Sequence, residues 1–187
     1  MRHFRPDPVD PALLDRLLQT ACLAPSVGLS QPWRFVTVDE PARRRAIRAD
    51  FTACNAEALA AQTSRAGHYA QLKLAGLDKA PVHLAVFVEP EPEQGDGLGR
   101  RTMPETTAYS AVLAIHTLWL AARAEGLGLG WVSIIDPVAI RRILDVADDW
   151  RLVAYLCLGY PTSEEATPEL ERTGWEWRRM SPAVTRR

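Results

Sequence analysis

The chain has 187 residues, with 22 lysines and arginines against 23 aspartates and glutamates, and 47% of its residues are hydrophobic. This length suits one domain with a single large core, and the balanced charge lacks the basic face that a nucleic-acid or acidic-membrane binder needs. The three cysteines form neither a CxxC pair nor an even-numbered framework, which argues against a disulfide scaffold or a zinc site. The N-terminus MRHFRPDPVD has no apolar signal region. We expect a soluble cytoplasmic protein that binds no metal.

Helix and strand patterns alternate along the first half of the chain. Asp10 and Pro11 form an N-cap followed by proline at the first helical position. The continuous apolar run from Val82 to Val88 is typical of a strand buried on both faces. The elements expected here are a helix over 11–23, a strand over 34–38, a helix over 41–62, a short helix over 68–77 and a strand over 82–88.

One long apolar helix dominates the second half. Residues 89–104 form a long polar loop, and loops of this length are usually functional or disordered. The helix over 104–125 is apolar on nearly every side, which places it at the centre of the core or at a subunit interface. The remaining elements expected are a strand over 129–134, a helix over 137–146, a strand over 152–158 and a tail over 162–187. The sum is a single α+β domain over 1–187, with a small mixed sheet around a long central helix.

Several motifs suggest chemistry that their context does not support. The string GLGLG at 126–130 follows a helix and opens a strand, whereas a dinucleotide-binding fingerprint follows a strand and opens a helix. Gly126 is more simply the residue that ends the long helix. No G-x-S-x-G nucleophile elbow is present. The histidines, which do not share metal-ligand spacing and favour core or interface roles, are His3, His68, His83 and His116.

Arginines and a glycine-rich loop could together bind a phosphate group. Arginine forks and backbone amides are the groups that a terminal phosphate requires. The residues that could gather around one are Arg2, Arg5, Ser26, Arg100 and Arg101. Solvated surface arginines are the alternative for each of them.

Seven strings carry a resemblance that spans nearly the whole chain. They are MRHFRPDPV, APSVGLSQPWRF, LKLAGLDKAP, GRRTMPETTAYS, LWLAARAEGLGLGWVSIIDP, YLCLGYP and PELERTGW. Together they resemble the nitroreductase-like flavoproteins, and more narrowly the branch of 5,6-dimethylbenzimidazole synthases. The first and fifth strings are the specific ones, because QPW and LGYP occur across the wider superfamily.

The resemblance implies a homodimer with FMN sites at the subunit interface, built from both chains. It also implies a reaction in which reduced FMN and O₂ are converted to 5,6-dimethylbenzimidazole and erythrose 4-phosphate, for the lower ligand of cobalamin. The reducing equivalents come indirectly from NAD(P)H, through a separate flavin reductase. A dry, covered pocket would favour this chemistry over loss of peroxide to water.

The resemblance also assigns roles to residues of this chain. Ser133, in GWVS, matches a catalytic serine near the reactive nitrogen of the flavin, where a hydroxyl can donate and accept a proton. Residues 55–76 match a lid over the flavin. The other cofactor-binding positions implied are Arg2 in a phosphate clamp, Ser26 and Gly28 in a loop that contacts the flavin, and Leu74 against the ring.

The chain begins just after a position where the family carries Arg-Arg-Asp, whose aspartate is a catalytic acid or base. These residues would precede Met1, so we expect that Met1 is not the natural start. Two other functions stay open. One is an NAD(P)H-dependent flavin reductase or nitroreductase that keeps its FMN, and the other is an inactive FMN-binding protein.

Overall fold

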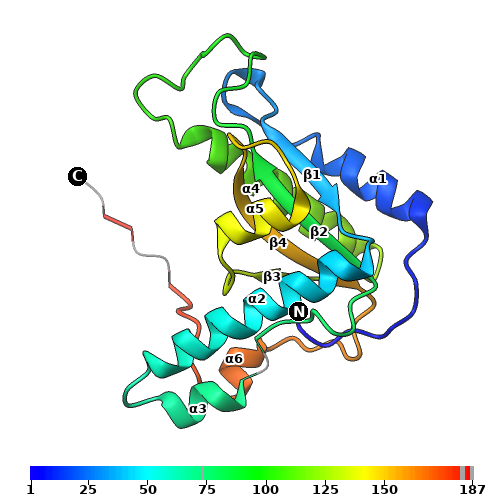
Figure 1. The fold of residues 1–187 in the computed structure, drawn as a ribbon, viewed down its shortest axis with the longest axis vertical. Coiled ribbons are helices and arrows are strands. Elements are labelled where there is room, and N and C mark those ends of the chain that lie inside the picture. Colours follow the sequence, from blue (N-terminus) through cyan, green and yellow to red (C-terminus); the bar gives the residue numbers. More distant parts are fainter. Residues whose placement is uncertain (73, 182–183, 186–187) are drawn as a thin grey trace.

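The computed structural model describes residues 1–72, 74–181 and 184–185. Figure 1 shows the arrangement of its helices and strands, which in chain order are α1 (Pro11–Ala21), the 3-10 turn η1 (Val27–Leu29), β1 (Trp33–Thr37), α2 (Pro41–Ala60), α3 (Ala66–Gln71), β2 (Val82–Val88), α4 (Thr106–Ala124), β3 (Gly128–Val132), α5 (Pro137–Leu144), β4 (Arg151–Gly159) and α6 (Glu169–Arg172). None of the described helices is both long enough and apolar enough to cross a membrane.

The four strands form one sheet in the order β1-β2-β4-β3, and every neighbouring pair is antiparallel. The expectation of a mixed sheet is therefore wrong. The apolar run of β2 indicates burial on both faces, and in this fold helices cover both faces of an antiparallel sheet. A continuous apolar run therefore indicates that a strand is buried on both faces, but it does not indicate whether the strand is parallel or antiparallel to its neighbours.

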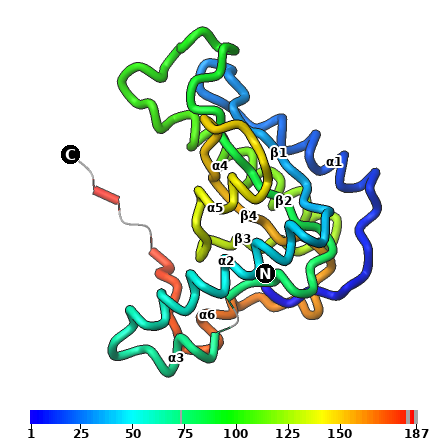
Figure 2. The backbone as a smooth tube through the Cα atoms, in the orientation of Figure 1, coloured from blue at the N-terminus to red at the C-terminus, as the bar shows by residue number. Residues whose placement is uncertain are grey.

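Two helical layers enclose the sheet, as the backbone trace in Figure 2 makes clear. α1 and α4 cover one face, toward which Leu84 and Val86 of β2 point. α2 and α5 cover the other face, toward which Ala85 and Phe87 point. Successive strand residues point to opposite faces, so every residue of β2 from Leu84 to Val88 is buried.

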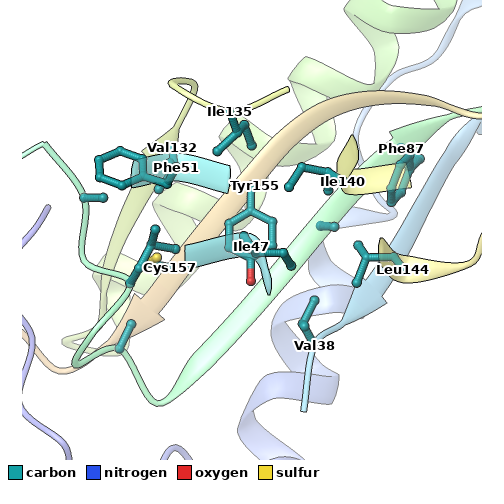
Figure 3. Close-up of a cluster of buried hydrophobic side chains, with 14 of the residues drawn as sticks. Val38, Ile47, Phe51, Phe87, Val132, Ile135, Ile140, Leu144, Tyr155 and Cys157 are labelled. Atoms are coloured by element: carbon teal, nitrogen blue, oxygen red, sulfur yellow. The ribbon is translucent and has the colours of Figure 1, made fainter. Parts of the chain in front are cut away.

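The layer under α2 and α5 is the largest buried cluster. Figure 3 shows Tyr155 and Cys157 of β4 among side chains from both helices, including Ile47 and Ile140. All four of these residues have 0% exposure. At about 25 cal/mol per Å² of apolar surface, burial of this kind supplies the main driving force that holds the helices on the sheet.

The helix ends follow the sequence signals. The carboxylate of Asp10 accepts from the Ala12 amide at 2.9 Å, and that of Asp136 accepts from the Val138 amide at 2.8 Å. Gly126 takes a φ of +72° directly after α4, as a residue that ends a helix in the left-handed conformation does. The predicted N-cap at Asp10 and the predicted helix end at Gly126 are confirmed.

α4 contacts all four strands and α1, which confirms it as the central helix. Its outer face is nevertheless exposed in the single chain. The apolar residues on that face, which are between 40% and 58% exposed, are Tyr109, Val112, Leu113 and Leu120. His116 lies exposed among them. One face of this apolar helix therefore has no covering surface within the described residues.

One expected element, the short helix after α2, ends well before its expected bound, and most others end within two residues of theirs. The short helix expected over 68–77 is α3, and it stops at Gln71 because Leu72 already has an extended ψ of 133°. The following segment packs against the N-terminal residues instead of continuing the helix, with Gly76 against the Phe4 ring. The strand expected over 129–134 ends at Val132.

Candidate functional site

The N-terminal residues lie between the edge strand β3 and the segment that follows α3. A Cβ added to Gly130 would lie 2.0 Å from the carbonyl oxygen of Met1. A Cβ added to Gly76 would lie 2.3 Å from the Phe4 ring. Real Cβ contacts are never this short, so both positions require glycine. These two close approaches bring Arg2 beside both segments.

Arg2 has one weak ionic partner. Its Nη1 lies 3.7 Å from Oε2 of Glu169, and its side chain is 25% exposed. Oε1 of the same carboxylate is 3.0 Å from Nε2 of His3. A guanidinium with one long contact keeps donors free for a phosphate or carboxylate, which it binds through two parallel hydrogen bonds.

Ser133 follows the last residue of β3 and is exposed. Its hydroxyl forms no hydrogen bond with any residue that the structure describes. The backbone just beyond it is fixed, because the Asp136 amide donates to the Asp50 carboxylate at 3.0 Å and Asp136 caps α5. The structure thus holds an unpaired hydroxyl on an anchored loop.

Leu74 lies on the segment between α3 and β2, half-buried against the cluster of Figure 3. A cavity of about 160 Å³ lies between this segment and α2, and Phe51, Asn55 and Leu77 also line it. Ordinary ligand pockets measure about 300–1,000 Å³, so the cavity of a single chain could enclose only part of a flavin. Within the lid expected over 55–76, residue 73 lies outside the described residues, as do 182–183 and 186–187 of the expected tail.

The loop that holds Ser26 and Gly28 is conformationally strained. Gly28 has a φ of +56°, and the non-glycine residues Leu29 and Gln31 also have positive φ values, 53° and 41°. Non-glycine residues in this region cost free energy and cluster at functional sites. The Ser26 hydroxyl accepts from the Gln31 amide at 3.1 Å, and the Val27 amide donates to Ser110 of α4 at 3.0 Å. The strain is therefore held in place by specific contacts.

The predicted site residues do not gather at one end of the sheet. Phe4 bridges to Pro161 beyond the end of β4, which places Arg2 at that end of the sheet. Trp33, next to the Ser26 loop, pairs with Val88, whose partner Arg151 begins β4. The two ends of this nine-residue strand are about 30 Å apart. One chain therefore places Arg2 and the segment of Leu74 near one end of the sheet and leaves Ser26 and Gly28 at the other. Ser133 belongs to neither end, because it follows Val132, which pairs with Tyr155 in the middle of β4.

The arginines that could share one phosphate do not gather in a single chain. Arg5 pairs with Asp7 at 3.0 Å. Arg100 donates to the carbonyl oxygens of Pro90 and Pro92 at 3.4 and 3.1 Å, in the loop at the top of Figure 1. Arg100 and Arg101 line a separate cavity of about 670 Å³ together with Arg151. The prediction of one shared cluster is wrong for a single chain, because its members lie on different ends of the sheet.

The cysteines carry free thiols. Burial, with a smaller contribution from the Asp50 carboxylate, raises the pKa of Cys54. Burial raises the pKa of Cys157 to about 12. The thiolate is the nucleophilic form, so neither residue supports cysteine catalysis at neutral pH. Among the described residues no group of three His, Cys, Asp or Glu side chains could hold a metal ion.

Sequence reasoning missed two features of this region. Glu169, which contacts both Arg2 and His3, lies in the string PELERTGW, but nothing in that string indicates its partner. Arg65, His68 and Tyr69 all contact Trp175. Their i, i+3, i+4 spacing could have indicated a shared helix face, although not what covers it.

Comparison with known proteins identifies the family. The nitroreductase family profile matches residues 1–160. A 5,6-dimethylbenzimidazole synthase from Rhodospirillum rubrum is 59% identical over 187 residues, which cover all of this chain and 89% of that protein. A protein of the same name from Rhodobacter capsulatus is 52% identical over 177 residues, 94% of this chain and 86% of that protein.

Solved structures share the fold. Iodotyrosine deiodinase bound to FMN and 3-iodo-L-tyrosine superimposes with a TM-score of 0.76 at 23% sequence identity, over 98% of this chain and 91% of that one. At that identity the likeness concerns the fold alone. The family profile and the full-length identity lead to one conclusion: the chain belongs to the nitroreductase family.

Proposed function

We propose that the protein is a 5,6-dimethylbenzimidazole synthase, which converts reduced FMN and O₂ to 5,6-dimethylbenzimidazole and erythrose 4-phosphate. The observation that carries this proposal is the 59% identity to a synthase over every residue of the chain. The packing around Gly76 supports it, because the Phe4 ring and the Arg2 carbonyl lie against this residue and bring Arg2 close to the segment that holds Leu74, although they are far apart in the sequence.

The described residues fit FMN by their chemistry. Arg2 has donors free for the phosphate, since its contact with Glu169 is 3.7 Å long. Leu74 and the cavity beside it offer apolar surface to a ring. When bound in its reduced form, FMN supplies the electrons that activate O₂ and the carbon atoms of the product.

Ser133 is the residue that we assign to proton transfer. Its hydroxyl has no partner among the described residues, and a hydroxyl can both donate and accept a hydrogen bond. The anchored loop after β3 fixes where that oxygen lies, which catalysis by a proton-transfer group requires. Ser133 Oγ would hold and return a proton beside the flavin ring.

We further propose that the working site needs a second copy of the chain. The exposed apolar face of α4 is the surface that a partner would cover, since obligate interfaces are large and hydrophobic. The cavity of about 160 Å³ beside Leu74 is too small for a whole flavin. The Ser26 loop, about one strand length from Arg2 in its own chain, could complete the site of the partner.

A separate flavin reductase that uses NAD(P)H would supply the reduced FMN, in the cytoplasm. The proposed reaction consumes the flavin, so each turnover needs a new molecule of it. An enzyme that instead kept its FMN would have no such requirement, and this difference separates the two functions experimentally.

The test is to mix the protein with chemically reduced FMN under argon, admit O₂, and analyse the products by chromatography. Formation of 5,6-dimethylbenzimidazole with loss of FMN supports the proposal. Intact FMN that is repeatedly reduced by added NAD(P)H and reoxidised by O₂ indicates a flavin reductase, and intact FMN without such turnover indicates a binding protein. A form with Arg-Arg-Asp placed before Met1 is assayed in parallel, and absence of the product from both forms overturns the proposal.

A further inference from the structure

The residues after β4 form a tight turn that packs against distant parts of the chain. Gly174 follows α6 with a φ of +75°, which reverses the chain direction. The amide of Trp175 then donates to the carbonyl of Leu170 at 2.8 Å. The turn is thus closed by its own hydrogen bonds and holds Trp175 at a defined position. We call residues 169–175 the C-terminal clasp.

One side of the clasp contacts α3 through the Trp175 ring. Cζ of Arg65 lies 3.9 Å from the centroid of the Trp175 ring. The rings of His68 and Tyr69 meet the same indole edge-on, with centroids 5.5 and 6.1 Å away. Residues at this spacing share one face of a helix, so a single tryptophan covers that whole face. Cation–π and edge-on aromatic contacts both favour this arrangement.

Hydrogen bonds to backbone carbonyls of the clasp also hold Arg65 and His68 beside Trp175. His68 Nε2 lies 2.8 Å from the carbonyl oxygen of Thr173 and donates to it, and Arg65 donates to the carbonyl of Trp175. The hydroxyl of Tyr69, whose ring contacts Trp175, also donates to Asn55 of α2 at 2.9 Å. α3 is therefore connected to both α2 and the clasp, and its separation from the clasp would break all of the contacts to Trp175.

The other side of the clasp holds the N-terminal residues. Glu169 lies 3.0 Å from His3 and 3.7 Å from Arg2. The Thr162 amide, just before the clasp, donates to the carbonyl of His3 at 3.2 Å. One short segment therefore contacts both the helix that precedes Leu74 and the arginine proposed to bind phosphate.

We infer that the C-terminal clasp positions the lid over the flavin, and that Trp175 is the positioning residue through which it acts. This inference rests on the proposed function only in that the ligand is FMN. Leu74 follows the end of α3 at Gln71 by only three positions, so the position of α3 limits where Leu74 can lie. Opening of the lid then requires Trp175 to leave Arg65, His68 and Tyr69, so the clasp slows the escape of FMN.

The experiment compares the full-length protein with Trp175→Ala, Trp175→Phe and Trp177→Ala. Trp177 is a matched control, because it is 69% exposed and its ring contacts no described ring or cation. Oxidised FMN is bound, and its dissociation rate is measured from the recovery of flavin fluorescence. Amide hydrogen exchange of residues 66–71 is measured in the ligand-free protein, and thermal unfolding shows that each variant is folded.

We expect Trp175→Ala to speed FMN dissociation by about tenfold, the equivalent of one cation–π contact with its packing, and to speed exchange in α3. Trp175→Phe should have FMN dissociation and α3 exchange rates close to those of the wild type. Trp177→Ala should change neither rate. If Trp175→Ala does not fold, Arg65→Met, which keeps the aliphatic stem and removes the cation, takes its place. A folded Trp175→Ala with unchanged dissociation and exchange, or an equal effect of Trp177→Ala, overturns the inference.

These readouts do not depend on product formation. Faster dissociation in Trp175→Ala together with no 5,6-dimethylbenzimidazole from any form would support the clasp and refute the proposed reaction. Wild-type protein that binds no FMN would refute the proposed function, and exchange in α3 would still decide whether Trp175 positions that helix.

Discussion

His83 on β2 and Tyr155 on β4 form a hydrogen-bonded pair inside the core, with 2.8 Å between Nδ1 and the phenolic oxygen. Their rings meet edge-on at 5.7 Å, and His83 is only 2% exposed. Burial, with a smaller effect of the Arg44 guanidinium, lowers the pKa of His83 to about 4. Burial likewise raises the pKa of Tyr155 far above its usual range. At neutral pH both groups are therefore uncharged, as their surroundings require.

The first prediction concerns stability against pH. The folded protein keeps His83 neutral down to about pH 4, whereas the unfolded chain takes up a proton near pH 6.5. Stability is complete above pH 6.5 and falls as the pH drops toward 4, because the unfolded state then binds more protons. The shift of this one group corresponds to about 3 kcal/mol. Urea unfolding across this range measures it, and His83→Gln should show a shallower decline. Equal slopes for the two proteins would contradict the assignment.

The second prediction concerns the partner of that histidine. Tyr155→Phe keeps the ring and removes the hydroxyl, which leaves a ring nitrogen of His83 buried without its hydrogen bond. Loss of about 1–3 kcal/mol of unfolding free energy is expected, the cost of one unsatisfied buried polar group. Urea denaturation at pH 7 checks this, and a change below a few tenths of a kcal/mol would show that the hydrogen bond adds no net stability.

The third prediction concerns catalysis by Ser133. Ser133→Ala should leave FMN bound and lower the rate of 5,6-dimethylbenzimidazole formation by about 10²–10⁴, as removal of a positioned proton-transfer group does. Single-turnover assays with reduced FMN and O₂ measure the rate, and flavin fluorescence measures binding. Ser163→Ala, an exposed serine beyond β4, is the control. A near-normal product yield from Ser133→Ala would show that Ser133 does not take part in proton transfer.

The fourth prediction concerns the α4 surface. Leu113 is 44% exposed in the middle of that apolar face, and glutamate there would place a charge within the proposed interface. Light scattering at low micromolar concentration should give a dimeric mass for the wild type and a monomeric mass for Leu113→Glu, with weaker FMN binding. Leu23→Glu, at a residue that is 82% exposed outside α4, should remain dimeric. A monomeric wild type would refute the second-copy site.

The fifth prediction concerns the strained loop. A Cβ at Gly28 would lie 2.7 Å from the Leu98 carbonyl oxygen, and its φ is +56°. Gly28→Ala should cost about 1–3 kcal/mol of stability and weaken FMN binding. Gly67→Ala is the opposite case, because no atom lies within 4 Å of a Cβ there and the residue is in α3, so it should stabilise by up to about 1 kcal/mol. Equal effects of the two changes would show that the loop backbone is not constrained.

Local signals located most elements because they depend on residues close together in the chain. The strand over 82–88 was predicted with its observed bounds, since a continuous apolar run must be buried on both faces. The caps at Asp10 and Asp136 form hydrogen bonds two residues away. α3 stops at Gln71 rather than at 77 because the packing of Gly76 against Phe4 is a long-range contact that no local pattern contains.

The sequence by itself determined that this chain is an α+β member of a flavoprotein family with a serine, Ser133, just after a strand, because apolar periodicity, caps and motif strings are local properties. Only the tertiary structure decided that all strands are antiparallel, that Arg2 and Ser26 lie at opposite ends of the sheet, and that Trp175 covers α3. These features depend on strand pairing and on contacts between residues that lie from 63 to 110 positions apart. The free energy of such contacts comes from burial and geometry in three dimensions, which spacing along the chain does not encode.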